Sequence, residues 1–426
     1  MQLVERHKIK PTHRFWQQID ELCFLSKNLY NYANYQVRQS FIADSVYISY
    51  NQLYHRIKHT PDYKALPAKV SQQVLRLLDK NWKSFFNANK AYKTNPNLFK
   101  ARPKLPKYKD KLKGRNILIY TIQAISKKEL KQGLVKLSGT NICLSTKVSN
   151  ICQARIVPSS GEYVVEIVYS KEVLKTKVNK NQVAAIDIGV NNLCALTSNK
   201  SGFIPVLING RPLKSVNQYY NKTKAKLQSL LPRNQLNSRS IQLLTRKRNN
   251  RVDTYLHLCS RWIVNHLSGH GIGKLIIGLN PGWKQSVALG TKTNQSFTGI
   301  PHSRLIQMLT YKAELLGIEV IVREESYTSV ASFLSLDPIP TYERERGSEF
   351  KSISNRAVGD KNALQVEFSG YRESRGMYKQ RGAKTRINAD VAASYNLMRK
   401  EIPEIFTRRG IEDVVVRPVR VTPSRN

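Results

Sequence analysis

The sequence predicts a multidomain α/β protein, and three changes of pattern along the chain lead to this fold class. Apolar residues recur at helical spacing in the first hundred residues, residues of alternating character follow, and strands alternate with helices from about Asn181. Strands that alternate with helices indicate an α/β domain. At 426 residues the chain is long enough for two or three domains, each with its own core.

The first segment is expected to be mainly helical. After Phe15, apolar residues stand at the three- and four-residue spacings of one helical stripe: Ile19, Leu22, Leu29, Ala33 and Val37. A second stripe follows Pro67: Val70, Val74, Leu77, Leu78, Trp82 and Phe85. The opposite face of this second helix carries Lys80, Lys83, Lys90 and Lys93. Both stripes indicate core faces, and a lysine face of this kind is usually only solvated.

A basic strap, Lys100–Arg115, follows the helices. It contains eight basic residues and one acid: Lys100, Arg102, Lys104, Lys107, Lys109, Lys111, Lys113 and Arg115, with Asp110. Pro103 and Pro106 forbid a continuous helix. An extended basic segment is suited to following a phosphate backbone, so Lys100, Arg102, Lys104, Lys107 and Lys109 are candidate nucleic-acid contacts. A plain flexible linker is the alternative.

Strand patterns begin at about Asn116. PSSGEY between RIV and VVEIVY predicts a hairpin turn within a small β-barrel or sheet. VAAIDIGVNNLCAL predicts a buried strand, a turn and a second strand. The order that follows is a basic helix (TRKRNNRVDTYLHLCSRWIVNHLS), the strand KLIIGL, the helix SRLIQMLTYKAELLG, the strand IEVIVREES, an irregular polar stretch and the helix NADVAASYNLMRK.

The charge of the chain points to a polyanionic partner. Lys and Arg number 70 and Asp and Glu 29, which gives a net charge of +41. Nucleic acid is the expected partner, and Arg246, Lys247, Arg248 and Arg251 on the basic helix are further candidate phosphate contacts, or else an exposed helix face. With no membrane-spanning run and no apolar signal core, we expect a cytoplasmic prokaryotic protein that uses neither a membrane nor a small-molecule substrate.

Zinc is not expected. The five cysteines (Cys23, Cys143, Cys152, Cys194 and Cys259) are scattered, with no CxxC pair and no His at ligand spacing. Structural zinc requires clustered soft ligands, and disulfides are rare in a reducing cytosol. The cysteines are interpreted as core or surface thiols.

Two aspartates are candidates for metal-dependent chemistry. Asp187 ends a strand that is apolar on both faces, where a carboxylate without a partner is costly. Asp390 begins a helix in INAD, where an N-cap is the simple alternative. With a third acid, the two could hold the pair of divalent ions that activates water and stabilises the leaving oxygen in phosphodiester hydrolysis.

Several motifs together resemble the TnpB (OrfB) family of bacterial insertion sequences. They are the opening LVERHKIKPTHRFWQQIDELCFLSKNLYN, LPAKVSQQVLRLLDKNWKSFF, RPKLPKYKDK with GRNILIYT, AAIDIGVNNL, GWKQ, MLTYKAELLGIEV, EESYTS and INADVAASYN. The resemblance runs almost from end to end. It implies an RNA-guided DNA endonuclease related to the type V CRISPR effectors, with a guide RNA, a target DNA and Mg²⁺, for which Mn²⁺ could substitute.

The resemblance also implies a domain order. Residues 1–14 would form the first strand of a β-barrel wedge domain, residues 15–115 a helical recognition lobe that ends in the strap, and residues 116–180 the rest of the wedge domain. Residues 181–400 would form an RNase H-like (RuvC) nuclease domain with an insertion around 328–386, followed by a tail at 401–426. By position, Asp187 matches the first RuvC acid and Asp390 the third.

The second acid of the family motif is missing from its usual place, where Gly278 and Leu279 stand. A subgroup with GWKQ carries EESYTS downstream instead, which implies Glu324 or Glu325 as the relocated ligand. Strict alternation along the strand slightly favours Glu324, although a turn at Ser326 could exchange the two. Two solvated strand-end charges are the simple alternative. The family's four-cysteine zinc ribbon is also missing.

Three functions remain open on the sequence. The leading hypothesis is the RNA-guided endonuclease, which cuts through Asp187, Asp390 and Glu324 or Glu325. The alternative is an RNA-guided DNA-binding protein, repressor-like, that has lost a metal ligand and no longer cuts. A basic RNA-binding or ribosome-associated protein would explain the charge but not Asp187. A tyrosine transposase is disfavoured because no Tyr stands in a His-rich metal setting.

Overall fold

The computed structural model describes residues 1–159, 161–173, 178–233, 235–280, 291–340, 368–374, 376–382, 386–406 and 416–424. The chain divides into two compact units, Met1–Glu172 (unit 1) and Val173–Asn426 (unit 2). The unit boundary therefore falls shortly before the expected end of the wedge domain at residue 180.

Unit 1 contains the two long helices expected from the apolar stripes. Its helical elements are α1 (Trp16–Asp44), α2 (Tyr50–Ile57), α3 (Pro61–Lys64), α4 (Ala68–Thr94) and the 3-10 turn η1 (Pro96–Leu98). Ile19 and Ala33 of α1 and Val70 and Trp82 of α4 are fully buried, which confirms both stripes as core faces. Trp82 also donates from Nε1 to Asn34 Oδ1 at 3.0 Å, so its one polar atom is satisfied.

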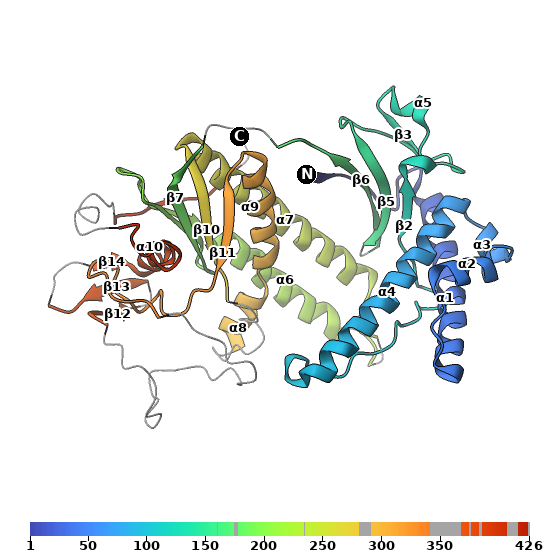
Figure 1. The fold of residues 1–426 in the computed structure, drawn as a ribbon, viewed down its shortest axis with the longest axis horizontal. Helices are drawn as coiled ribbons and strands as arrows, with labels where there is room; N and C mark the ends of the chain where they lie inside the picture. The colour runs from blue at the N-terminus through green and yellow to red at the C-terminus, as the bar shows by residue number, and fades with distance from the viewer. Residues whose placement is uncertain are drawn as a thin grey trace. The chain divides into compact units, whose positions relative to one another are not determined.

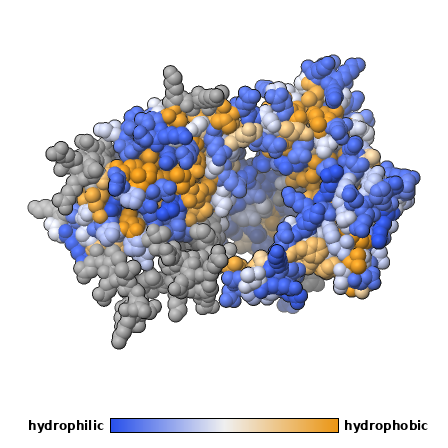
Figure 2. Space-filling view, viewed as in Figure 1, coloured by the Kyte–Doolittle hydropathy of each residue, from blue (hydrophilic) through white to orange (hydrophobic). Residues whose placement is uncertain are grey.

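A four-stranded antiparallel sheet completes unit 1, in the order β1-β6-β5-β2. The strands are β1 (Gln2–Ile9), β2 (Leu118–Thr121), β5 (Ile151–Ser159) and β6 (Glu162–Ser170). The hairpin predicted from PSSGEY is confirmed, because β5 and β6 pair directly across it. Smaller elements lie between β2 and β5: η2 (Ile122–Ala124), α5 (Lys127–Leu130), β3 (Leu134–Lys136) and β4 (Cys143–Ser145). The face of unit 1 in Figure 2 is mainly hydrophilic, with small apolar patches.

Unit 2 is built on a six-stranded sheet in the order β11-β10-β7-β8-β9-β15. The strands are β7 (Asn179–Ile188), β8 (Asn192–Ser198), β9 (Val206–Asn209), β10 (Ile272–Gly278), β11 (Glu319–Arg323) and β15 (Val419–Val421). Strands β7, β8 and β9 form an antiparallel meander, whereas β10 and β11 run parallel to β7. The carboxyl ends of β7, β10 and β11 therefore meet at one edge of the sheet.

Helices cover both faces of this sheet, with α10 on one side and α7 and α9 on the other (Figure 1). The helices of unit 2 are α6 (Arg211–Ser229), α7 (Arg239–Gly269), α8 (Thr291–Thr298), α9 (His302–Leu315) and α10 (Ala389–Glu401). Along β7, Ala184 and Ile186 pack in the core with α7 and α9, while Val183 and Ala185 pack with α10. This alternation explains why both faces of the strand are apolar from Val183 to Ile186.

The sequence did not predict four strands in the C-terminal part of the chain. The stretch interpreted as irregular contains β12 (Gly370–Ser374) and β13 (Met377–Gln380), which form a three-stranded antiparallel sheet with β14 (Arg386–Asn388). Part of the expected tail, β15, pairs in parallel with β9 at the sheet edge. These strands are short and polar, so they lack the alternation that identifies a half-buried strand.

Candidate active site

Asp187 lies near the carboxyl end of β7, in the middle of the sheet of unit 2. Side chains alternate along a strand, so Asp187 shares a face with Val183 and Ala185, the residues that pack with α10. Small side chains bring α10 close to the sheet at this point. Ser394 donates from Oγ to the carbonyl oxygen of Ala185 at 2.9 Å, which fixes the helix directly over the strand that carries Asp187.

Asp390 lies in the first turn of α10 but does not cap the helix. Asn388 is the N-cap, and its side chain accepts hydrogen bonds from the backbone N–H groups of Asp390 and Val391. The N-cap interpretation of Asp390 is therefore wrong. Its carboxylate instead accepts a hydrogen bond from Asn192 Nδ2 at 2.8 Å and lies 3.6 Å from Arg372 Nη2.

Glu324 and Glu325 follow β11, which ends at Arg323, and they have different partners. Glu324 forms an ion pair with Lys400 of α10, with Nζ and Oε2 2.5 Å apart, and the Lys400 side chain is almost fully buried. Glu325 is held by Asn280: the backbone N–H of Glu325 donates to Asn280 Oδ1 at 3.1 Å. Because β11 ends before the glutamates, strand alternation does not decide between them, and the assignment of the metal ligand to Glu324 or Glu325 stays a prediction.

Gly278 makes room for Glu325. A Cβ atom added to Gly278 would lie 2.8 Å from Oε2 of Glu325 and 2.8 Å from Cδ1 of Leu397. Both distances are below what real Cβ atoms tolerate, so any larger residue at position 278 would displace its neighbours. The end of β10 and the segment after β11 are adjacent in the parallel sheet. The carboxylate of Glu325 therefore occupies the space beside the end of β10 where a side chain at position 278 would begin.

Electrostatic interactions connect the three acids Asp187, Glu325 and Asp390. Burial, together with the negative charges of Glu325 and Asp390, raises the pKa of Asp187 well above its usual value, and Arg372 acts in the opposite direction. Burial and the charge of Glu324 raise the pKa of Glu325 to about 7, against the effect of Lys400. Like charges in a poorly solvated site disfavour ionisation, and the positive charges of Arg372 and Lys400 do not fully offset burial and repulsion at Asp187 and Glu325.

Glu324 shows the opposite electrostatic behaviour. Burial alone would raise its pKa, but hydrogen bonds from Lys400 and from Ser326 hold the pKa below the usual value. Glu324 is thus a satisfied carboxylate with a dedicated cation, whereas Oε2 of Glu325 is buried and accepts no hydrogen bond from the described residues. Of the two adjacent glutamates, only Glu325 therefore has a buried carboxylate oxygen left to bind a metal ion.

The carboxylates of Asp187, Glu325 and Asp390 are suitable ligands for a hard divalent cation, although they are not arranged closely around one point. Within the ranges that the structure describes, no group of three or more His, Cys, Asp or Glu side chains is positioned to hold a metal ion as it stands. The buried, unpartnered oxygen of Glu325 and the raised pKa of Asp187 are what mutually repelling carboxylates produce without a cation. Carboxylate oxygens are the ligands that Mg²⁺ prefers.

Three residues that the sequence analysis missed help to position this site. Arg372 comes from β12, in the stretch interpreted as irregular, and no sequence pattern connects it with Asp187 or Asp390. Lys400 and Asn396 of α10 hold the segment after β11, since Lys400 Nζ donates to the carbonyl oxygen of Ser326 and Asn396 Nδ2 to that of Thr328. Helix α10 therefore carries Asp390 and also anchors the loop that presents Glu325.

The basic strap lies extended along α1. Side chains on one face of α1 donate to strap carbonyl oxygens: Lys27 to Lys111, Asn31 to Lys109, and Asn34 and Arg38 to Pro106. These hydrogen bonds fix the backbone, so the flexible-linker interpretation does not hold for this stretch. The five candidate contacts, Lys100, Arg102, Lys104, Lys107 and Lys109, all have exposed side chains.

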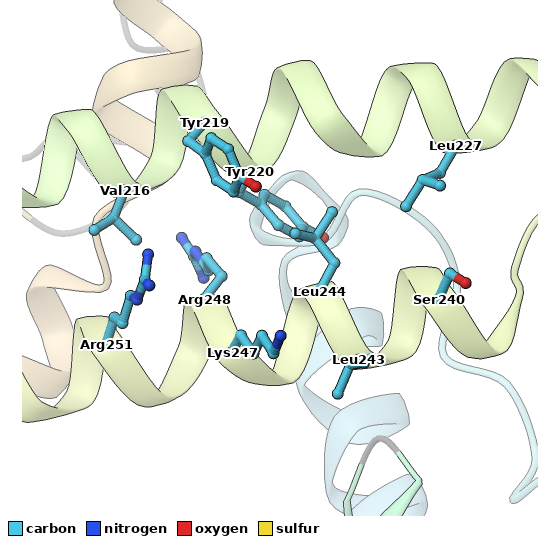
Figure 3. A pocket seen from close by; sticks show the side chains of 10 residues that line it. All are labelled: Val216, Tyr219, Tyr220, Leu227, Ser240, Leu243, Leu244, Lys247, Arg248 and Arg251. Atoms are coloured by element: carbon cyan, nitrogen blue, oxygen red, sulfur yellow. The ribbon is translucent and has the colours of Figure 1, made fainter.

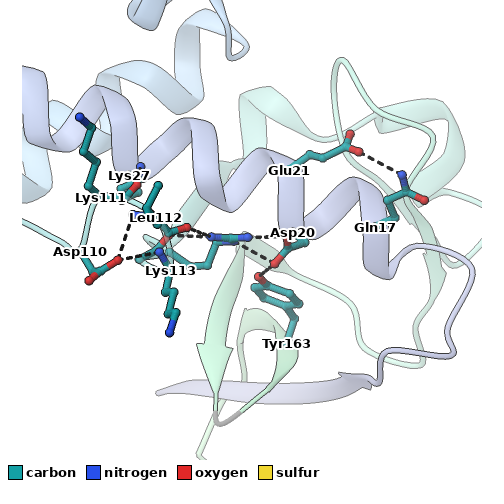
Figure 4. Close-up of polar contacts among 11 residues, drawn as sticks. Gln17, Asp20, Glu21, Lys27, Asp110, Lys111, Leu112, Lys113 and Tyr163 are labelled. Carbon is teal, nitrogen blue, oxygen red and sulfur yellow. Dashed lines mark hydrogen bonds and ion pairs between the residues drawn. The ribbon is translucent and has the colours of Figure 1, made fainter. Parts of the chain in front are cut away.

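The end of the strap has a structural role. Arg115 forms a bidentate ion pair with Asp20 of α1, at 2.9 and 2.6 Å. Tyr163 donates a hydrogen bond to the same Asp20 carboxylate (Figure 4). Nearby, Asp110 accepts from the backbone N–H groups of Leu112 and Lys113. Arg115 is thus committed to unit 1 and is not placed to bind phosphate.

The four basic candidates on α7 differ in their surroundings. Lys247 and Arg251 are exposed, and Arg246 is partly buried. Arg248 donates to Asn217 Oδ1 at 2.8 Å and to the carbonyl oxygen of Gly299, so its guanidinium joins α7 to α6 and to the segment before α9. Three of the five N–H groups of Arg248 are therefore engaged within the protein, and its contact with phosphate stays a prediction.

Two expectations lie outside the described residues. The GWKQ motif at residues 282–285 is one, and much of the insertion expected around 328–386 is the other. No helix in the described parts of the chain is both long enough and apolar enough to span a bilayer.

Comparison with known proteins gives one family and several loosely similar structures. The structures include a Cas12f1-sgRNA-target DNA complex (14% identity, TM-score 0.36, covering 94% of this chain and all of that one) and the mini-RNA-guided endonuclease CRISPR-Cas_phi3 (9% identity, TM-score 0.45, covering 94% and 92%). A CRISPR-Cas12f ternary complex matches at 12% identity and a TM-score of 0.35, over 90% of this chain and 82% of that one. None of the curated proteins compared with the chain matches it. Residues 166–283, which include β7, Asp187 and β10, match the model of the OrfB_IS605 family, described as "probable transposase".

Proposed function

We propose that the protein is an RNA-guided DNA endonuclease encoded by a bacterial insertion sequence, which hydrolyses phosphodiester bonds with a divalent metal. The observation that carries this proposal is the electrostatic grouping of Asp187, Glu325 and Asp390 at one edge of the unit 2 sheet. The sheet supports it: a three-stranded antiparallel meander followed by two strands parallel to the first agrees with the RNase H-like expectation.

Asp187, Glu325 and Asp390 would hold the metal. When bound, Mg²⁺ would lower the pKa of a water molecule and stabilise the leaving oxygen of the phosphodiester. Asn192 orients the carboxylate of Asp390 through its hydrogen bond, and Arg372 places a positive charge beside it, where a phosphate oxygen could also be bound. The Glu324–Lys400 ion pair fixes the chain immediately before Glu325.

The guide RNA and the protein would have different roles in recognising the target DNA. Base pairing with a guide RNA would select the target DNA, and the protein would hold the heteroduplex by its backbone. The strap suits this task because its backbone is fixed on α1 while Lys100, Lys104 and Lys107 remain exposed. The net charge of +41 is consistent with extensive phosphate contact.

The test compares single substitutions in the metal-site residues. Asp187→Asn, Glu325→Gln and Asp390→Asn should each abolish Mg²⁺-dependent cutting of a guide-matched DNA while guide-dependent binding is retained. Glu324→Gln is the matched control and should keep measurable cutting. The guide is identified by sequencing the RNA that co-purifies with the protein.

The outcomes separate the open functions. Cutting that survives Asp187→Asn would remove Asp187 from the active site and would refute the RuvC-like assignment. Guide-dependent binding with no cutting by the wild-type protein, in Mg²⁺ or Mn²⁺, would establish the nuclease-inactive DNA-binding protein instead. Retention of RNA with no guide-dependent DNA binding would favour a plain RNA-binding protein.

A further inference from the structure

Helices α6 and α7 lie side by side in unit 2 and leave a groove along their seam (Figure 3). Its larger hollow has a volume of about 390 Å³. Its lining includes Val216, Tyr219 and Tyr220 of α6 and Lys247, Arg248 and Arg251 of α7. A hollow of this size with apolar walls and a few polar groups is typical of a ligand site.

The stretch of chain that lines the larger hollow of this groove contains basic residues and no acidic ones. From Ile188 to Val252 the chain has no Asp or Glu, and its first acid after Asp187 is Asp253, which pairs with Arg304 at 2.9 Å. The same stretch has twelve basic residues: Lys200, Arg211, Lys214, Lys222, Lys224, Lys226, Arg233, Arg239, Arg246, Lys247, Arg248 and Arg251. The charge of this part of the chain therefore favours an anionic ligand.

Bonds between the two helices preform the groove. Tyr220 Oη and Thr245 Oγ1 are 3.1 Å apart, and the guanidinium of Arg248 lies over the Tyr220 ring at 5.6 Å. Arg248 also bonds Asn217 and Gly299. Tyr220 and Arg248, which line the hollow, are therefore already held in place by bonds within the protein, so a ligand need not order them.

Other lining residues are available to a ligand. Tyr219 is 61% exposed and Leu243 is 40% exposed, although both border the hollow. Lys247 and Arg251 are exposed cations on the facing helix. An accessible aromatic ring beside free cations is the combination that binds unpaired nucleotides, since the ring stacks on a base and the cations bind phosphate.

A second hollow of about 360 Å³ continues along the same seam. It is lined by Pro212, Leu213, Val216, Asn250, Arg251, Thr254, Tyr255 and Leu258. Val216 and Arg251 belong to both hollows, so Arg251 lies where the two meet. A cation between two apolar hollows matches a strand in which a phosphate separates consecutive bases.

We infer that the α6–α7 groove binds two consecutive unpaired nucleotides of a single-stranded nucleic acid, with Tyr219 stacked on one base and Arg251 bound to the phosphate between them. The inference rests on the proposed function only in that the protein handles nucleic acid. A duplex is not the ligand, because its bases are stacked on each other and cannot lie against Tyr219. An acidic peptide would satisfy the cations but would leave the aromatic ring without a flat partner.

The experiment measures binding to short labelled strands by fluorescence anisotropy. The full-length protein, freed of RNA by nuclease treatment and high salt, is titrated in EDTA with ten-nucleotide RNA, ten-nucleotide DNA and a DNA hairpin duplex. Tyr219→Leu should weaken binding of the single strands roughly 5- to 140-fold, as expected for the loss of one stacked base. Tyr219→Phe keeps the ring and should bind like the wild type. Tyr35→Leu, at an exposed tyrosine of unit 1, is the matched control and should change nothing.

Further arms of the experiment test the cation and the source of the strand. Arg251→Gln should weaken single-strand binding and reduce the slope of log K against log salt concentration by about 1. A larger Tyr219→Leu effect on RNA than on DNA would identify the guide as the ligand, and the reverse would identify displaced DNA. Either result supports the inference.

Three results would overturn it: unchanged single-strand binding by Tyr219→Leu, an equal loss on the hairpin duplex, or competition by a poly-glutamate peptide that depends on Tyr219. A wild-type protein that bound none of the nucleic acids would instead contradict the proposed function. Failure of the groove and failure of the nuclease assignment are therefore distinguishable.

Discussion

Replacing Glu325 by Gln should stabilise unit 2 in the absence of metal, although the same change should abolish cutting. The wild-type carboxylate has one buried oxygen without a hydrogen-bond partner among the described residues and lies in a group of like charges. An amide of the same shape removes the charge. Glu324→Gln should do the opposite, because it removes the partner of the buried Lys400.

The magnitude follows from the pKa of Glu325, which burial and the charge of Glu324 raise from 4.5 to about 7. A carboxyl with a raised pKa holds its proton more tightly in the folded state, so the free energy of unfolding falls as pH rises from about 4.5 to 7. One pKa unit corresponds to about 1.4 kcal/mol, so ionisation destabilises the fold by up to roughly 3 kcal/mol above pH 7. Glu325→Gln should recover this amount at pH 8 and almost none below pH 4.5.

The assay is thermal and urea denaturation of the two variants and the wild type in EDTA, at pH 5 and pH 8. A domain of this size gains roughly 2–4 °C in melting temperature per kcal/mol, so the Glu325→Gln gain at pH 8 should amount to several degrees. Adding Mg²⁺ should stabilise the wild type and not Glu325→Gln, because binding to the folded state alone raises stability. If Glu325→Gln is no more stable than the wild type at pH 8, or responds fully to Mg²⁺, then the roles assigned to the two glutamates are wrong.

Three further predictions follow. Lys400→Met should lower the free energy of unfolding by about 2 kcal/mol, because it leaves Glu324 partly buried without its cation. In urea denaturation, the double variant Lys400→Met with Glu324→Gln should recover part of this loss. Asp20→Asn should destabilise unit 1 by roughly 2 kcal/mol at pH 7. Burial would raise the pKa of Asp20, but hydrogen bonds from Arg115 and Tyr163 lower it, so its stabilisation is present above pH 3.8 and is lost as pH falls through the folded pKa. A difference from the wild type that does not shrink as pH falls below 3.8 would contradict this. Elemental analysis of the purified protein should find no stoichiometric zinc, and a zinc-selective chelator should leave its melting temperature unchanged, because the cysteines are scattered.

The sequence by itself determined the main elements of the fold. The apolar stripes predicted α1 and α4, the PSSGEY turn predicted the β5–β6 hairpin, and the continuous apolar run predicted β7 with Asp187 at its end. These signals are local, because the period of burial follows directly from helix or strand geometry. The short strands β12, β13 and β15 had no such signal, because they are polar and bury few side chains.

The tertiary structure decided which side chains surround Glu324, Glu325 and Asp390. Strand alternation favoured Glu324, but β11 ends at Arg323, before both glutamates. In the folded chain Glu324 pairs with the buried Lys400, whereas Glu325 lies beside Gly278. Nothing local connects Arg372 with Asp390, since the two meet only through the folding of separate segments. Hydrophobic periodicity reports which face of an element is buried, whereas the charge that a carboxylate meets depends on side chains from distant parts of the chain.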